Sequence, residues 1–310
     1  MLATIFSIAP IFVLIILGYG LRRGGIPSID FWNLNDKLVY WVLFPALLFH
    51  TMATVELSGD LLGKFAITVY AGFAAALIFS FFVGRFCKLP RPTWTSVMQG
   101  CARHNTFIAL AVAERVFGAE GLVLAALITA ILIPVTNLSI VPLMITLLQG
   151  AGRNKLFKVI VREVGRNPLL IAVALGIGAN TAGVSDIPVL FDVAKVLGAA
   201  ALPIVLLCVG ANLRVRKMSA AIVPTLISMM GKMIIFPGVI AIFALATGLA
   251  PLPTLIAMVF GAVPSSANAY TLARQIGGDA PTMAAIVTMQ TAVSFFTLPV
   301  TLMLVQRWVS

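Results

Sequence analysis

The sequence has few charged residues for its length. Lysine, arginine, aspartate and glutamate make up 10% of its 310 residues, hydrophobic residues make up 61%, and the mean hydropathy is +1.08. A soluble domain carries about 25% charged residues. Runs without any charge approach the roughly 20 residues that a membrane-spanning helix needs, and they recur at 1–21, 38–55, 66–84, 121–152, 167–185, 196–213, 233–273 and 280–306. The sequence therefore predicts a polytopic integral membrane protein and excludes a soluble one.

Cysteines and recognisable catalytic motifs are also scarce. The three cysteines, Cys87, Cys101 and Cys208, have neither the spacing of a metal site nor that of a redox motif. We interpret them as small packing residues. The predicted spans contain no paired aspartates, no His-Glu-x-x-His motif and no nucleophile beside a base. We therefore expect neither an intramembrane enzyme nor a metal site or cofactor.

Basic residues outnumber acidic residues by 21 to 10, which gives a formal net charge of +11. Nucleic acid is not an expected partner, because these residues lie in short turns between apolar runs, as the positive-inside rule predicts. With the N-terminus outside, three basic residues fall in outer segments, Lys64, Arg115 and Arg307. Fourteen fall in inner loops: Arg22, Arg23, Arg85, Lys88, Arg91, Arg153, Lys155, Lys158, Arg162, Arg166, Arg214, Arg216, Lys217 and Arg274.

This asymmetry predicts a multi-pass protein of the cytoplasmic (inner) membrane, surrounded by lipid, with both termini extracytoplasmic. Residues 1–21 lack a basic start, so we expect a retained first span and no cleavable signal peptide. Ten spans are predicted, at 3–21, 31–53, 62–84, 92–116, 120–148, 167–182, 188–211, 219–247, 252–274 and 280–307. Segment 149–166 is then a basic cytoplasmic linker between the halves 1–148 and 167–310.

The two halves repeat each other. The pattern P-x7-G-x-G occurs at 10–20 and again at 168–178, and three further matches follow in order at offsets of 157–159 residues. Each half holds five spans, an odd number, so the second half must enter the membrane upside down. The predicted fold is therefore an all-α membrane protein of two inverted five-helix repeats, an architecture typical of transporters.

Span nine contains an unusual polar segment, "GAVPSSANAYTLARQ" at 261–275. Pro264 lacks an N–H group and clashes with the preceding turn, so it should interrupt the helix near the middle of the membrane. Ser265, Ser266 and Asn268 follow it, and their side chains are suited to cap a second half-helix.

Span four is disturbed at the matching depth. Arg103, His104, Asn105 and Thr106 lie near its middle, and Asn105 and Thr106 are candidate caps for its outer half. Unpaired backbone in hydrocarbon survives only where it is buried in protein or lines a cavity. Two breaks at equivalent places in inverted halves thus predict that helices four and nine cross at a substrate site.

The predicted site favours an anion. Both second half-helices direct the positive ends of their dipoles toward the crossing, Arg103 adds a full charge, and no aspartate or glutamate lies centrally in any span. Lys232 in span eight is either a charge in the same cavity or a buried, uncharged amine. Asn137 in span five and Gln290 and Ser294 in span ten either face the substrate or hold helices together by hydrogen bonds.

Three segments resemble the auxin efflux carrier family, which includes the plant PIN proteins and bacterial carriers of malonate and related dicarboxylates. They are "RHNTFIAL" in span four, "VPSSANAYTLARQ" in span nine and "QTAVSFFTLP" in span ten, and the resemblance extends over the whole chain. Two features depart from the family. Ala111 stands where bacterial members often carry proline, and the long hydrophilic loop of the plant proteins is reduced to 149–166.

The resemblance implies a scaffold domain of spans one, two, six and seven. It also implies a transport domain of spans three to five and eight to ten, elevator-like alternating access and a homodimer. Substrate contacts are implied at Asn105 and Asn137. The overall architecture implied is that of the bile acid symporters and of NhaA.

The function that these observations favour is secondary transport of small organic anions, such as dicarboxylates or auxin-like carboxylates. The alternative is a sodium-coupled organic anion symporter of the bile acid carrier type. Sodium sites use carbonyl and carboxylate oxygens, so the missing intramembrane acids count against it, although carbonyl and hydroxyl oxygens could suffice. Coupling to a proton or to sodium stays open. A passive channel fits less well, because inverted broken helices suit alternating access.

Overall fold

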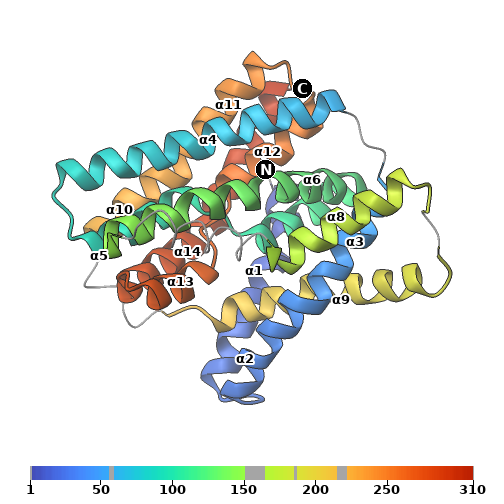
Figure 1. Cartoon of the computed structure of the whole chain (residues 1–310), viewed down its shortest axis with the longest axis horizontal. Helices are drawn as coiled ribbons and strands as arrows, with labels where there is room; N and C mark the ends of the chain where they lie inside the picture. The colour runs from blue at the N-terminus through green and yellow to red at the C-terminus, as the bar shows by residue number, and fades with distance from the viewer. Residues whose placement is uncertain (1, 56–58, 151–164, 185–186, 215–221, 310) are drawn as a thin grey trace.

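The computed structural model describes residues 2–55, 59–150, 165–184, 187–214 and 222–309, and their regular secondary structure is entirely helical (Figure 1). Six stretches are long and apolar enough to cross a membrane: Ile5–Arg23, Asp60–Phe86, Arg91–Gln149, Leu190–Ala211, Ile222–Ala246 and Ala280–Trp308. Two shorter apolar helices accompany them, Pro168–Thr181 and Pro251–Ala262. Each of the ten predicted spans coincides with helical segments, whereas most of the predicted linker 149–166 lies outside the described residues.

The helices follow one another along the chain as α1 (Leu2–Arg23), α2 (Ile29–Leu38), η1 (Val39–Leu43), α3 (Phe44–Ala53), α4 (Gly59–Phe86), α5 (Arg91–Ala102), α6 (Thr106–Gln149), α8 (Pro168–Thr181), α9 (Leu190–Ala211), α10 (Ile222–Met230), η3 (Gly231–Ile235), α11 (Phe236–Ala246), α12 (Pro251–Ala262), α13 (Asn268–Ile276) and α14 (Ala280–Val309). The elements η1 and η3 are single π-helical turns within longer helices.

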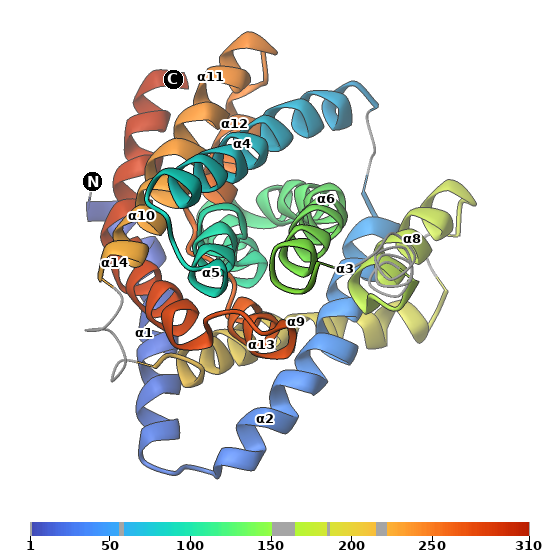
Figure 2. The same cartoon turned by 60° about the vertical axis from the view of Figure 1, so that its left-hand side comes forward.

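The helices pack in two groups. In the first, α1 packs against α9, and α3 packs against α8 and α9. In the second, α4 packs against α5 and α11, while α14 contacts α5, α10, α12 and α13. Figure 2 separates α3 and α8 from α4, α10, α11 and α14. Helix α6 contacts both groups, so the region beside α6 is where the groups meet.

Two predicted spans, 31–53 and 219–247, are helical but widen locally into π-helix, which the sequence reasoning did not foresee. Each π-helical turn is followed at once by phenylalanine and proline, Phe44-Pro45 after η1 and Phe236-Pro237 after η3. A proline inside a helix removes one hydrogen bond and clashes with the carbonyl four residues earlier. A π-helical turn before the proline is one way in which the helix continues past it.

Helix α6 combines parts of the two predicted spans 92–116 and 120–148. Its one residue with non-helical backbone angles is Gly118, at φ 68° and ψ −156°. A residue with a Cβ rarely adopts such angles, whereas glycine does so readily. The gap that the hydropathy pattern predicted between these spans is therefore a glycine kink in the structure.

The two interruptions predicted in spans four and nine are present. Helix α5 ends at Ala102 and α6 begins at Thr106, while α12 ends at Ala262 and α13 begins at Asn268. The residue after each first half-helix is extended, with ψ of 150° at Arg103 and 152° at Val263. The interruptions lie against each other, because the backbone N–H of Asn105 donates to the carbonyl of Pro264 at 2.8 Å.

Side chains satisfy the backbone groups that the interruptions leave unpaired. The buried Gln290 of α14 accepts from the N–H of Ser265 at 2.8 Å and donates to the carbonyls of Gly100 and Ser228 at 3.0 and 3.2 Å. The fully buried Lys232 donates to the carbonyl of Phe260 at 3.0 Å. The last carbonyls of a helix have no partner within that helix, so Gln290 and Lys232 complete the ends of α5 and α12.

The first group depends on a close approach of α1 and α9. A Cβ atom built on Gly18 would lie 2.0 Å from the carbonyl oxygen of Leu207, whereas one on Gly20, two residues further along α1, meets nothing within 4 Å. Small residues allow membrane helices to approach in this way.

We predict that Gly18→Ala lowers the melting temperature of the purified protein by several degrees. The added methyl group must push the α9 backbone away, and overpacking of this kind costs on the order of 1–3 kcal/mol. Gly20→Ala is the matched control and should leave the melting temperature unchanged or slightly higher. Equal melting temperatures for the two variants in a thermal-shift assay in detergent would contradict the α1–α9 contact.

A second prediction concerns Gln290. Gln290→Leu leaves the N–H of Ser265 and the carbonyl of Gly100 buried and unpaired, at about 1–3 kcal/mol for each group. We expect a large loss of monodisperse protein in size-exclusion chromatography. The control is Ser294→Ala, because the Ser294 hydroxyl donates only to the carbonyl of Thr291 within its own helix. If Gln290→Leu is as monodisperse and heat-stable as the control, Gln290 does not hold the interruptions together.

Candidate functional site

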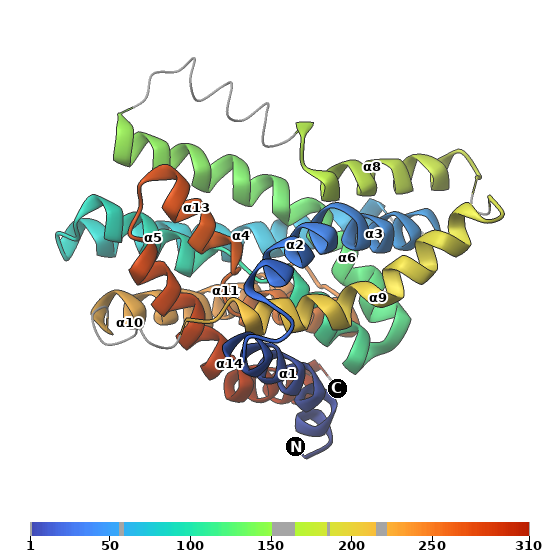
Figure 3. The ribbon, with the colours of Figure 1, turned by 90° about the horizontal axis from the view of Figure 1, so that it is seen from below.

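A cavity of about 510 Å³ lies where the two groups of helices meet. Its volume falls within the range of small-molecule sites, about 300–1,000 Å³. Figure 3 shows α2, α8 and α13, three of the elements around it. Its walls come from α2 and η1 (Asp36, Lys37, Tyr40, Trp41), the first interruption and the start of α6 (Arg103, His104, Thr106, Phe107), the middle of α6 (Ile133, Thr136, Asn137, Val141), the start of α8 (Asn167, Leu169), and the second interruption with α13 (Ser266, Asn268, Thr271, Leu272, Gln275).

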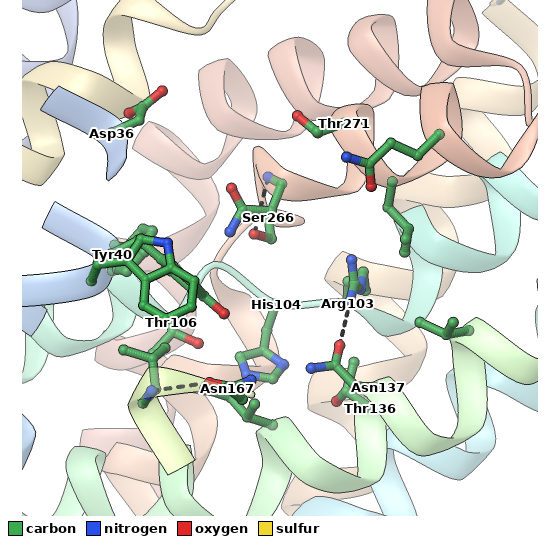
Figure 4. A pocket seen from close by; sticks show the side chains of 18 of the residues that line it. Asp36, Tyr40, Arg103, His104, Thr106, Thr136, Asn137, Asn167, Ser266 and Thr271 are labelled. Atoms are coloured by element: carbon green, nitrogen blue, oxygen red, sulfur yellow. Dashed lines mark hydrogen bonds between the residues drawn. The ribbon is translucent and has the colours of Figure 1, made fainter. Parts of the chain in front are cut away.

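The guanidinium of Arg103 lies in this cavity and donates a hydrogen bond to Oδ1 of Asn137, as Figure 4 shows. This bond joins the first interruption to the middle of α6 and fixes the direction of the guanidinium. A guanidinium presents its donors in a planar fork that matches the geometry of a carboxylate. Both residues were predicted to contact the substrate, and the structure places both in the cavity wall.

Two helix N-termini border the cavity. Thr106 is the first residue of α6, and Asn268 is the first residue of α13. The hydroxyl of Ser266 accepts from the N–H of Asn268 at 3.3 Å, so Ser266 performs the capping that was expected of three residues together. Each helix start carries a partial positive charge of roughly half a unit. The cavity therefore has three positive features in its wall, Arg103 and these two helix starts.

Asn105 was expected to contact the substrate, but its side chain lies behind the cavity wall. Its side chain is fully buried and is not part of the cavity wall. Its Oδ1 accepts from the N–H groups of Phe107 and Ile108 at 3.1 and 3.2 Å, so Asn105 caps α6 as predicted. Asn105 thus positions the start of α6 behind the cavity wall, and its Nδ2 has no hydrogen-bond partner among the described residues.

Four further predicted site residues also lie outside the cavity wall. Ser265 and Gln290 are fully buried and bond to the ends of the half-helices, and Ser294 bonds within α14. Lys232 is fully buried as well, with its ammonium 3.9 Å from the centre of the Phe236 ring. Of the two interpretations left open by the sequence, the structure favours the helix-holding one for Gln290. Ser294 bonds only within its own helix, and the ammonium of Lys232 lies outside the cavity wall.

The residues predicted only to break the helices have unequal roles. Pro264 is buried and offers its carbonyl to Asn105. His104 lines the cavity, with its ring centre 5.5 Å from that of Phe260. His104 thus belongs to the site itself.

Several cavity residues were not predicted from the sequence, above all Asp36 and Lys37. No acid lies in the middle of any predicted span, yet Asp36, near the start of span 31–53, is part of the cavity wall. Nδ2 of Asn212 donates to Asp36 at 2.8 Å, and Arg22 donates to Oδ1 of Asn212 at 3.0 Å. The charged pair was visible inside the predicted span 31–53, and its position in a span was the signal that could have identified it.

Comparison with known proteins identifies the family of the chain. No curated protein matches the chain. The family described as membrane transport protein, the auxin efflux carrier family, matches residues 3–302, which is nearly the whole chain. That match agrees with the apolar helices and with the resemblance in spans four, nine and ten. The chain is therefore a multi-pass membrane protein, not an enzyme, and it belongs to the auxin efflux carrier family of membrane transport proteins.

Proposed function

We propose that the protein is a secondary transporter that carries small organic anions across the cytoplasmic membrane. The observation that carries this proposal is the cavity wall formed by Arg103, held by Asn137, together with the starts of α6 and α13. Fixed donors and helix dipoles of this kind bind carboxylates without rearrangement of the site. A carboxylate group of the substrate lies against the guanidinium of Arg103, in the positive field of the two helix starts.

The charge of the wall supports an anion of low charge. Its side chains with a formal charge are Arg103, Lys37 and Asp36, two cations and one carboxylate. With His104 neutral, the formal net charge is one positive, to which the two helix starts add. A cation would meet repulsion from Arg103 in this cavity, and a neutral solute would leave the guanidinium without a counter-charge.

The proposed mechanism is elevator-type alternating access. The helices α1, α2, α3, α8 and α9 form the scaffold, and α4 to α6 with α10 to α14 form the moving transport domain. This division is the one that the resemblance to the family implies. It is supported by the two packing groups and by the position of the cavity where they meet. A substrate held there moves with Arg103 relative to α2.

The proposed assembly is a homodimer, as the resemblance to the family implies. Both termini lie outside, as the distribution of basic residues favours. We predict that a phosphatase reporter fused after Ser310 is active, because that enzyme functions only outside the cytoplasm, and that the same reporter fused after Gly150 is inactive. An inactive reporter at Ser310 with an active one at Gly150 would reverse the proposed orientation.

The direct test of the proposed function is binding and uptake by Arg103→Gln. Loss of a hydrogen bond to a charged group costs about 1.5–3 kcal/mol, which lowers the apparent affinity for a carboxylate roughly ten- to hundredfold. The parent is assayed in proteoliposomes with monocarboxylates and dicarboxylates, with and without a sodium or pH gradient. A requirement for sodium would favour the sodium-coupled alternative.

Arg85→Gln is the matched control, because Arg85 lies exposed near the end of α4. It should bind and transport like the parent. Both variants must first elute as single peaks from size-exclusion chromatography. If folded Arg103→Gln binds the transported anion as tightly as the parent does, the cavity at Arg103 is not the carboxylate site.

A further inference from the structure

We propose that His104 and Thr136 form a second subsite in the cavity, which binds an uncharged hydroxyl group of the substrate. This inference rests on the proposed function and narrows it, because it assigns the substrate class as monocarboxylates that carry a hydroxyl group. The carboxylate lies at Arg103, and the hydroxyl group lies at the second subsite.

His104 is buried, yet it has no hydrogen-bond partner. Its exposed fraction is 5%, and neither Nδ1 nor Nε2 bonds to any atom of the part of the chain that the structure describes. Its ring is part of the cavity wall, and Figure 4 shows it projecting between Asn167 on one side and Thr136 and Asn137 on the other. Buried polar atoms in proteins almost always have a partner, so the position of His104 points to a group that enters the cavity.

The hydroxyl of Thr136 likewise lacks a hydrogen-bond partner within the described ranges. Its exposed fraction is 4%, it lines the cavity, and its Oγ1 has no partner among the described residues. Threonines within helices commonly donate to the carbonyl four residues earlier. Several do so here, namely Thr129, Thr146, Thr291 and Thr301. The hydroxyl of Thr136 does not take this local partner, and it stays available to a ligand.

The bond between Arg103 and Asn137 joins the two segments that carry His104 and Thr136, and all four residues line the same cavity. His104 follows Arg103 and Thr136 precedes Asn137, so each is the sequence neighbour of one member of the bonded pair. Successive Cα atoms lie about 3.8 Å apart. The second subsite therefore adjoins the carboxylate subsite, within the reach of a small molecule that occupies both.

The chemistry of the pair selects a hydroxyl group. A neutral imidazole has one donor and one acceptor, and a threonine hydroxyl also does both. A hydroxyl group on the ligand can donate to one of them and accept from the other. A second carboxylate fits less well, because an ionised carboxylate only accepts hydrogen bonds and would leave the acceptor nitrogen of a neutral imidazole without a donor.

The test compares matched acids that differ by one hydroxyl group: phenylacetate with mandelate, and propionate with lactate. Succinate and malate form the corresponding pair of dicarboxylates. Dissociation constants are measured by calorimetry on the purified full chain. We expect each hydroxy monocarboxylate to bind about three- to tenfold tighter than its partner, the range of one neutral hydrogen bond, and tighter than either dicarboxylate.

Variants identify the residues responsible. His104→Phe and Thr136→Val should bring the affinity ratio of mandelate to phenylacetate close to one, whereas His104→Gln, which keeps a donor and an acceptor, should retain most of it. Thr129→Val is the control on the same helix, because Thr129 bonds to the carbonyl of Ala125. His50→Phe is the control for the loss of an imidazole. Both controls should keep the ratio of the parent.

The outcomes separate this inference from the proposed function. One outcome is that the parent binds monocarboxylates without preferring the hydroxy acids, and that Arg103→Gln no longer binds them. In that case the subsite is wrong and the proposed function stands. Tighter binding of succinate and malate, or an unchanged ratio in both His104→Phe and Thr136→Val, also overturns the subsite. If the parent binds none of the six acids, both proposals fail. The affinity ratio of each hydroxy acid to its matched acid in the parent tests the subsite even if a variant does not fold.

Discussion

The hydrogen bond from the backbone of Asn105 to the carbonyl of Pro264 joins the two interruptions on which the site depends. Each interruption exposes backbone groups that would be costly in hydrocarbon. They are tolerated because they lie against each other and because Gln290 and Lys232 satisfy the adjoining helix ends. With this arrangement in place, α6 and α13 begin beside the cavity and Arg103 faces Asn137.

Polar residues in the apolar core therefore divide into two sets with different roles. Gln290 and Lys232 bond to the backbone and are closed off from the cavity, so they maintain the shape of the interruptions. Arg103, His104 and Thr136 line the cavity. A substitution in the first set should affect folding before binding, whereas one in the second set should alter which anions bind.

The sequence was sufficient for the positions of the interruptions, because proline and clustered polar residues inside an apolar run disrupt a helix for local reasons. It could not distinguish Asn137 from Gln290, since both are amides in the middle of a span. Which of them faces the cavity depends on the rotation of α6 and α14 about their own axes, and tertiary packing sets that rotation. Asp36 was missed because hydropathy alone does not show which partner a charged residue near the start of a span meets, here Asn212 of another helix.

The position of the cavity between the two packing groups links binding to transport. Its walls combine α2, η1 and α8 from one group with the interruptions and α13 from the other. A ligand in contact with both groups has an interaction energy that changes when one group moves relative to the other, and only such a difference can shift a conformational equilibrium.

The central claim is that the anion binds in this cavity with its carboxylate at Arg103. The most direct measurement is a crystal structure of the protein with a bound brominated carboxylate, such as 4-bromophenylacetate, located by the anomalous signal of bromine. The account predicts bromine density inside the cavity and a carboxylate within hydrogen-bond distance of Arg103. Density for a transported anion elsewhere, with the cavity at Arg103 containing none of it, would contradict the account.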